Sequence, residues 1–264
     1  MNDFNFHRPA AIQDASMLMS QRTDPRFIAG GMSLLPAMKL GFSAPTDLID
    51  LSQLPGLRGI EQRGERLWIG AMTSHAEVAR SALVRDMLPA LGALAAGIGD
   101  RQVRARGTLG GSLANNDPAA CYPAGVLALA ATIETHQRVI EADDFFQGIY
   151  QTALQPDEII TGVSFRRPLW ARYLKFHQPA SHYALIGVCV ARTADGVRVA
   201  VTGGGSGVFR CHALEQALAA RWHPEACRSV DVDTSELGSD LHASARYRAH
   251  LIGVLTARAV AESL

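Results

Sequence analysis

Residues 105–118 read Ala-Arg-Gly-Thr-Leu-Gly-Gly-Ser-Leu-Ala-Asn-Asn-Asp-Pro, a run rich in glycine and small polar side chains. Glycine permits a backbone with φ > 0 and lets a ligand approach where no Cβ stands in the way. The side chains of Thr108, Ser112, Asn115 and Asn116 carry hydroxyl and amide groups that can bond phosphate or sugar oxygens. The stretch therefore predicts a segment that wraps its N–H groups around an anion.

A second stretch of the same character, residues 26–35, reads Arg-Phe-Ile-Ala-Gly-Gly-Met-Ser-Leu-Leu. Residues 27–29 predict a short buried strand, and helix-like apolar spacing begins at Leu34, with Ser33 as a candidate N-cap. A strand, a Gly-Gly turn and a helix start form an anion site, because free N–H groups point outward there. Two such turns indicate a diphosphate ligand held from both sides.

Other interpretations of these glycines are a plain tight turn or a known nucleotide-binding motif. A Gly-Gly pair alone usually marks an ordinary tight turn. Lys39 is misplaced for a Walker A loop. Neither stretch is Gly-x-Gly-x-x-Gly, so the Rossmann dinucleotide fold is not supported.

Composition narrows the class of protein. The chain has 264 residues, 48% hydrophobic and 19% charged, which is typical of a globular protein. Lys plus Arg and Asp plus Glu both number 25, so no overall charge attracts nucleic acid or an anionic membrane. No apolar run approaches the ~20 residues of a transmembrane segment, and the N-terminus has no secretion pattern. We expect a cytoplasmic protein.

Cysteine and histidine spacing predicts no metal site in this chain. The four cysteines are widely spaced and form no Cys-x-x-Cys pair, so we expect free thiols and not zinc or iron–sulfur ligands. The histidines show no ligand spacing, and His75, His177 and His182 are expected to be surface or hydrogen-bonded residues. No Gly-x-Ser-x-Gly elbow is present. We assign no catalytic residue.

Periodicity predicts an α+β chain with three regions. The first 50 or so residues give β-α-β-α-β, with strands at 4–6, 27–29 and 47–51. After a Pro/Gly connection at 54–60 we expect strands at 66–71, 138–142 and 158–165 and helices at 75–81 and 89–98. Ser74 and Glu77 form a predicted capping box. Residues 124–131 and Ile133 are expected to form a buried helix or strand, and residues 143–148 a loop.

Beyond a boundary at 166–171 the pattern changes. Apolar runs at 183–192 and 197–202 flank Asp195-Gly196, which predicts a β-hairpin. The glycine cluster 203–207 follows the hairpin and opens no helix, so it is expected to be a flexible turn. Helices are expected at 211–221 and 241–264.

The motifs, taken in order, resemble the FAD-binding medium subunit of molybdenum hydroxylases, the group of carbon monoxide dehydrogenase and xanthine dehydrogenase. Residues 29–33 resemble that family's first FAD motif, Ala-Gly-Gly-x-Ser, and residues 108–111 its second, Thr-Ile-Gly-Gly. Residues 116–119 match the usual continuation, and the resemblance extends from about Phe4 to about Ala261. Similar positions include 69–71, 145–148, 240–245 and 247–248.

The resemblance implies a two-subdomain α/β FAD-binding domain of the PCMH type over residues 1–166, with subdomains of about 1–55 and 56–166. A smaller C-terminal antiparallel sheet with helices would follow over residues 167–264. Both glycine motifs would hold the FAD diphosphate, Asn115 and Asp117 would hold ribityl or ribose hydroxyls, and Ile159 and Ile160 would pack on the flavin ring. The implied cofactor-binding residues are Ile28, Ala29, Gly30, Gly31, Met32, Ser33, Leu34, Val103, Gly107, Thr108, Gly110, Gly111, Ser112, Asn115, Asp117, Ile159, Ile160 and Lys175.

The resemblance also implies partners. A large subunit would carry molybdopterin-bound molybdenum, and a small subunit would carry two two-iron two-sulfur clusters. The subunits would assemble as a dimer of heterotrimers, in which this chain passes electrons to an external acceptor. The run 117–130 leaves no room for the cysteine-rich loop by which some relatives hold a four-iron cluster.

Four positions depart from the family pattern. Met32 stands where His or Gln is frequent, Cys121 where an acidic residue is frequent, and Gln178 and His182 where Arg and Asp are usual. These substitutions motivate the hypothesis that acceptor choice or flavin potential differs in this chain. Two alternatives stay open: a self-contained flavin oxidase or dehydrogenase, and a non-redox nucleotide-binding module.

Overall fold

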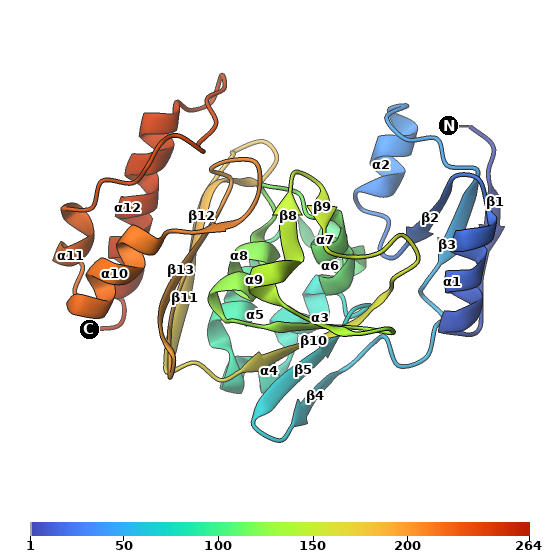
Figure 1. Cartoon of the computed structure of the whole chain (residues 1–264), viewed down its shortest axis with the longest axis horizontal. Helices are drawn as coiled ribbons and strands as arrows, with labels where there is room; N and C mark the ends of the chain where they lie inside the picture. The colour runs from blue at the N-terminus through green and yellow to red at the C-terminus, as the bar shows by residue number, and fades with distance from the viewer. Residues whose placement is uncertain (1) are drawn as a thin grey trace.

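The computed structural model describes residues 2–264. At one end of the molecule lies a small three-stranded parallel sheet in the order β1-β3-β2 (Figure 1). Its elements are β1 (Asn5–His7), α1 (Ile12–Gln21), β2 (Pro25–Ile28), α2 (Leu34–Lys39) and β3 (Asp47–Asp50). The predicted β-α-β-α-β order is confirmed. Ser33 occupies the N-cap position of α2, but its side chain makes no capping hydrogen bond.

The middle of the chain builds a five-stranded antiparallel sheet in the order β4-β5-β10-β6-β7. Its strands are β4 (Ile60–Arg63), β5 (Arg66–Gly70), β6 (Thr132–Thr135), β7 (Val139–Glu141) and β10 (Ile160–Arg166). Strand β4 was not predicted, because three of its four residues are polar and exposed and give no apolar signal. It forms a hairpin with β5 around Gly64, whose φ is +61°.

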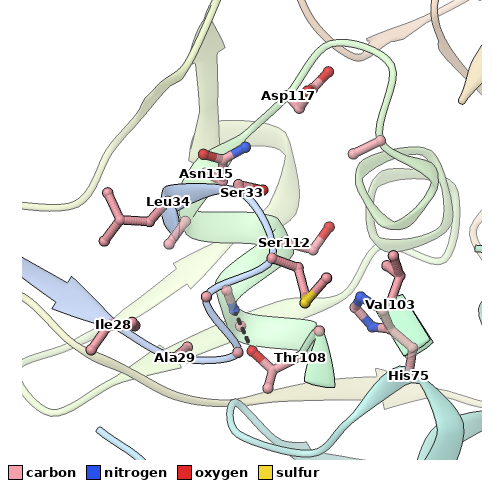
Figure 2. A pocket seen from close by; sticks show the side chains of 18 of the residues that line it. Ile28, Ala29, Ser33, Leu34, His75, Val103, Thr108, Ser112, Asn115 and Asp117 are labelled. Carbon is pink, nitrogen blue, oxygen red and sulfur yellow. Dashed lines mark hydrogen bonds between the residues drawn. The ribbon is translucent and has the colours of Figure 1, made fainter. Parts of the chain in front are cut away.

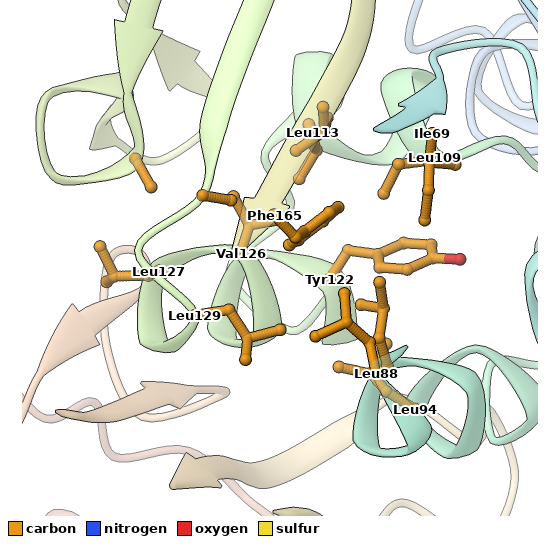
Figure 3. Packing of buried hydrophobic residues seen from close by; sticks show 14 of the residues in the cluster. Ile69, Leu88, Leu94, Leu109, Leu113, Tyr122, Val126, Leu127, Leu129 and Phe165 are labelled. Atoms are coloured by element: carbon orange, nitrogen blue, oxygen red, sulfur yellow. The ribbon is translucent and has the colours of Figure 1, made fainter. Parts of the chain in front are cut away.

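Helices cover this sheet and enclose the largest core of the molecule. They are α3 (His75–Arg80), α4 (Ala82–Met87), α5 (Pro89–Ala96), α6 (Arg101–Arg106), α7 (Leu109–Asn115), α8 (Cys121–Ala128) and α9 (Ala142–Phe145). Tyr122 of α8 and Phe165 of β10 are fully buried among leucines and Val126 (Figure 3). The predicted capping box is confirmed, because the Glu77 amide bonds the Ser74 hydroxyl while the Glu77 carboxylate accepts from the Ser74 amide.

Two segments of this region, 124–133 and 143–148, can be compared with their predictions. Of the segment left open as helix or strand, residues 124–128 belong to the helix α8, every residue of which is buried, and Ile133 lies in the strand β6. The predicted loop at 143–148 is wrong, because α9 ends there and β8 (Phe146–Gly148) pairs with β9 (Gln151–Thr152). Phe145 explains the difference: its ring is fully buried, and this long-range packing fixes a turn of helix that local propensity does not signal.

The C-terminal four-stranded antiparallel sheet has the order β11-β12-β13-β14. Its strands are β11 (Trp170–His177), β12 (Ala184–Thr193), β13 (Gly196–Thr202) and β14 (Phe209–Arg210), followed by α10 (His212–Ala220), α11 (Glu225–Arg228) and α12 (Ala245–Ala261). The predicted hairpin is confirmed, with Thr193 opposite Gly196. The glycine cluster is a turn that opens no helix, as predicted, and Gly205 bridges Leu237.

This C-terminal sheet is buried on both faces. One face packs on α5 and α8, and the other on α10 and α12 (Figure 1). The core of the middle region therefore extends to Tyr173, Cys189 and Ala200 of the third sheet. Strand β11 was not predicted, because its residues are mostly half-buried and show no clean alternation.

Candidate functional site

One large cavity, of about 1050 Å³, lies between the N-terminal sheet and the helices of the middle region. Its walls come from the β2–α2 loop, from α6 and α7, from the start of α8, and from residues 158–160 and 175–183. All eighteen residues that the sequence analysis expected at a cofactor line it: Ile28, Ala29, Gly30, Gly31, Met32, Ser33, Leu34, Val103, Gly107, Thr108, Gly110, Gly111, Ser112, Asn115, Asp117, Ile159, Ile160 and Lys175. Figure 2 shows Thr108, Ser112 and Asn115 along α7 beside the loop that carries Ser33.

The first glycine loop presents a run of unsatisfied backbone donors. Within residues 2–264, the amides of residues 30–34 have no hydrogen-bond acceptor, because the first bond of α2 is donated by Leu35 to the Gly31 carbonyl. Gly31 has φ +73°, in the left-handed region that favours glycine. Orphan amides on a cavity wall are rare unless a ligand or water satisfies them. This loop is therefore built to face an electron-rich group.

The second glycine stretch behaves differently from the expectation. It is the helix α7, whose N-cap Thr108 accepts a hydrogen bond from the Gly111 amide at 3.1 Å. The amides of Leu109 and Gly110 donate to the carbonyls of Thr73 (3.1 Å) and Ala71 (2.8 Å). The prediction that this stretch wraps its N–H groups around an anion is thus wrong for these three amides. What it turns toward the cavity is the Thr108 amide, which has no acceptor among the described residues, together with polar side chains.

The two glycine stretches meet at one edge of the cavity. A Cβ on Gly30 would lie 2.1 Å from the Arg106 carbonyl oxygen and 2.9 Å from the Cα of Gly107. A Cβ on Gly111 would lie 3.4 Å from the Cβ of Ala29. Glycine at position 30 is required by this backbone contact, because side-chain atoms have no room at such distances. The expectation that both motifs serve one ligand site agrees with this contact.

His75 lies in the same corner and was not predicted as a site residue. The expectation that it is exposed or hydrogen-bonded is wrong: it is 5% exposed, it lines the cavity, and its Nδ1 is buried without a partner. Burial, with a smaller contribution from the charge of Arg104, lowers the pKa of His75 to about 4. Its ring packs on Tyr122 at 5.2 Å between centroids. A lone histidine after a helix cap gives no sequence signal for this role.

At another wall of the cavity, Glu158 holds in place the backbone segment that leads into Ile159 and Ile160. Its buried carboxylate accepts from Arg138 at 2.9 and 3.0 Å, from Thr135 at 2.8 Å and from the Gln155 amide at 2.9 Å. The hydrogen bond from Arg138 is the main reason that the pKa of Glu158 falls to about 2. The carboxylate therefore stays charged and anchors the segment that delivers the two isoleucines to the cavity.

Lys175 is held by the protein itself. Its Nζ donates to the carbonyls of Gly97 and His182, both at 2.8 Å, and lies 3.5 Å from the Cys121 sulfur. It thereby ties the loop 178–183 to the end of α5 and the start of α8. His182 adopts φ +60° in this loop and stacks on His177 with ring centroids 5.7 Å apart. Both of these histidines are exposed, as expected.

Asp117 is also partly engaged within the chain. Its carboxylate accepts from the Ala119 amide at 2.8 Å and from the Tyr150 hydroxyl at 3.4 Å. The side chain of Asn115 has no partner among the described residues and remains available. Three of the four family departures, Met32, Cys121 and His182, line the cavity, and Gln178 does not.

Several further wall residues were not predicted, because most are isolated apolar or aromatic side chains far apart in the chain. They include Arg26, Phe42, Leu57, Met72, His75, Tyr150, Glu158 and Tyr183. No cluster of three or more His, Cys, Asp or Glu side chains able to hold a metal occurs in residues 2–264. Mostly apolar walls with a few converging donors suit a large amphipathic ligand such as a dinucleotide.

The chain is similar to known proteins along nearly its whole length. The family model described as FAD binding domain in molybdopterin dehydrogenase matches residues 2–168, and the CO dehydrogenase flavoprotein C-terminal domain matches residues 171–263. The chain is 39% identical to the nicotine 6-hydroxylase medium subunit of Paenarthrobacter nicotinovorans, over 97% of this chain and 95% of that protein. It is 32% identical to the carbon monoxide dehydrogenase medium chain of Hydrogenophaga pseudoflava, over 97% and 96%.

Solved structures agree with these matches. A chain of reconstituted CO dehydrogenase from Oligotropha carboxidovorans superposes with a TM-score of 0.92 at 30% identity, covering 98% of this chain and 97% of that one. In residues 2–264 no helix has the length and apolar character needed to cross a bilayer.

Proposed function

The chain belongs to the FAD-binding medium subunits of molybdenum hydroxylases, and from this premise we propose that it relays electrons from partner-held iron–sulfur clusters to an external acceptor. Its class is oxidoreductase and its cofactor is FAD. The observation that carries the proposal is the array of five unpartnered amides at residues 30–34 on the wall of a dinucleotide-sized cavity.

The residues present fit FAD. The amides of Gly30–Leu34 and of Thr108 would donate to the diphosphate oxygens, and the hydroxyl of Ser112 and the amide of Asn115 would bond sugar or ribityl hydroxyls. The buried side chains of Ile159 and Ile160 would pack on the ring system. When bound, FAD supplies the redox chemistry, and the protein supplies orientation and electrostatics.

The proposal includes the rest of the assembly. A large subunit would hold the molybdopterin-bound molybdenum and bind substrate, and a small subunit would hold two two-iron two-sulfur clusters. The complex would be a dimer of heterotrimers in the cytoplasm, with this chain divided at about residue 166.

The test has two stages. The purified chain is first titrated with FAD, and bound flavin bands at ~370 and ~450 nm are expected. The chain is then co-expressed with candidate large and small subunits of a molybdenum hydroxylase from the same genome, and the complex is reduced anaerobically with substrate. Flavin bleaching that requires the small subunit supports the relay. Bleaching by substrate in the isolated chain would instead show a self-contained flavin enzyme, and a chain that binds no FAD would refute the proposal.

A further inference from the structure

His75 stands out because both of its ring nitrogens lack partners. No hydrogen bond to either nitrogen occurs within residues 2–264, although the side chain is nearly enclosed. Its backbone amide donates to the Gly107 carbonyl at 2.9 Å, which fixes the start of α3 against the second glycine stretch. The Tyr122 ring packs against the imidazole, with the two ring centroids 5.2 Å apart. A buried imidazole without a hydrogen-bonding partner among residues 2–264 implies a partner from outside them, such as a bound ligand.

The position of the ring identifies the kind of partner. A Cβ on Gly107 would lie 2.5 Å from the His75 Nε2, and a Cβ on Gly30 would lie 2.9 Å from the Gly107 Cα. The imidazole and the unpartnered amides of the first loop therefore flank the same glycine. Figure 2 shows His75 beside Val103 at the cavity, across from the loop that carries Ser33. Hydrogen-bond donors on both sides of one glycine at the cavity wall suit an anionic oxygen bound beside it.

The tautomer follows from burial. Nδ1 is fully buried with no acceptor in reach, so a proton placed there would be an orphaned donor. The proton of the neutral ring is therefore better placed on Nε2, the nitrogen beside Gly107. We propose that His75 is a further ligand-binding residue, a neutral Nε2–H donor to a phosphate oxygen of the bound dinucleotide. This inference rests on the proposed function.

The surroundings keep the ring neutral. Arg104 of α6 is the charged group that acts on it, and its guanidinium is itself bonded to the carbonyls of Ile98 and Gly99. Tyr122 of α8 contributes a neutral phenol, α5 carries no titratable side chain, and Arg85 and Asp86 of α4 are exposed. On the same helix, the Glu77 carboxylate is bonded back to Ser74. Because the ring stays neutral, its hydrogen bond is expected to contribute equally to FAD affinity across pH 6–8.

Three variants of the apoprotein test the role: His75→Phe, which keeps the ring packing on Tyr122; His75→Gln, whose amide nitrogen can occupy the place of Nε2; and exposed His250→Gln as a control. FAD affinity is measured by fluorescence, with thermal unfolding as a check on folding. A hydrogen bond to a charged group predicts about 10- to 100-fold weaker binding for the Phe variant, with recovery in the Gln variant and no change in the control.

Two ligand fragments identify the bonded group. ADP carries the diphosphate and riboflavin does not, so the Phe variant is expected to lose affinity for ADP by a similar factor and to bind riboflavin like the wild type. The ratio of wild-type to Phe-variant affinity for FAD is expected to stay constant from pH 6 to 8. Nitrogen-15 spectra of wild-type imidazoles are expected to show His75 as the Nε2–H tautomer, shifted by FAD.

The outcomes separate the two proposals. Wild-type protein that fails to bind FAD refutes the proposed function. Wild-type protein that binds FAD, with a Phe variant that binds equally well, or a folded Gln variant as weak as the Phe variant, overturns only the role of His75. If both variants fail to fold, the wild-type spectrum decides, and an Nδ1–H tautomer or a titration between pH 6 and 8 overturns the proposal.

Discussion

At the scale of single residues, Glu158 shows how a buried charge can position the wall of a cavity through hydrogen bonds within the chain. Its carboxylate is 0% exposed and accepts four hydrogen bonds, two of them from Arg138. Its pKa in the folded protein, about 2, lies below the ordinary value of 4.5. The stabilisation is therefore fully present above pH 4.5 and is lost as the pH falls toward 2.

We predict that Glu158→Gln lowers the free energy of unfolding at pH 7 by roughly 1–2 kcal/mol, a value discounted because Arg138 is half exposed. The difference from the wild type is expected to shrink at pH 3, as measured by urea unfolding. Glu61→Gln, in an exposed pair with Arg63, is the matched control and is expected to change stability little. An undiminished difference at pH 3 would contradict the linkage argument.

At the scale of elements, the site depends on two loops in backbone contact. Gly30 of the β2–α2 loop packs on the Arg106 carbonyl, and no relaxation of a side chain can relieve a clash there. The unpartnered amides belong to the first loop, while α7 uses its own first amides to hold the fold. The two motifs thus differ: the first leaves its backbone amides free at the cavity wall, whereas α7 uses its first amides within the fold and lines the cavity with the Thr108 amide and polar side chains.

We predict that Gly30→Ala pushes the loops apart, weakens FAD binding more than tenfold and destabilises the protein by about 1–3 kcal/mol. Gly253→Ala is the control, because it lies within α12 with no atom nearer than 4.0 Å to the new Cβ, and it is expected to leave FAD affinity unchanged. FAD titration and thermal unfolding measure both effects. A Gly30→Ala protein with normal FAD affinity would show that the contact does not matter for binding.

At the scale of the whole molecule, residues 26 to 183 contribute segments to the cavity, so a ligand there links the N-terminal, the five-stranded and the C-terminal sheets. Lys175 belongs to the third sheet, yet it reaches Gly97 of the middle region and the wall residue Cys121. Binding should therefore protect the assembled fold, since a ligand that binds only the folded state stabilises it.

Cysteine labelling can measure whether a bound ligand protects the cavity. All four cysteines are buried, but Cys121, at 6% exposure, lines the cavity, whereas Cys189, Cys211 and Cys227 do not. We predict that iodoacetamide modifies Cys121 of the folded apoprotein first, and that FAD slows this reaction at least tenfold, as followed by peptide mass spectrometry. Cys189 and Cys227 serve as internal controls that react only on unfolding. Labelling of Cys121 at the same rate with and without FAD would place the ligand elsewhere.

The sequence by itself determined the features that local chemistry controls. The glycine motifs, the Ser74–Glu77 capping box and the Asp195-Gly196 hairpin follow from backbone freedom and short-range hydrogen bonds, which the local residues specify. The resemblance in those motifs also identified the family, and all eighteen expected site residues line one cavity.

Only the tertiary structure decided which donors remain free. The amides of Leu109 and Gly110 donate to the carbonyls of Thr73 and Ala71, which lie 36 and 39 positions away, whereas the amides of the first loop meet no such acceptor among residues 2–264. The enclosure of His75, the edge strand β4 and the helix turn at Phe145 likewise depend on long-range packing. A hydrogen bond is satisfied by whatever atom lies near it in space, and spatial neighbours are set by the whole fold and not by adjacent sequence.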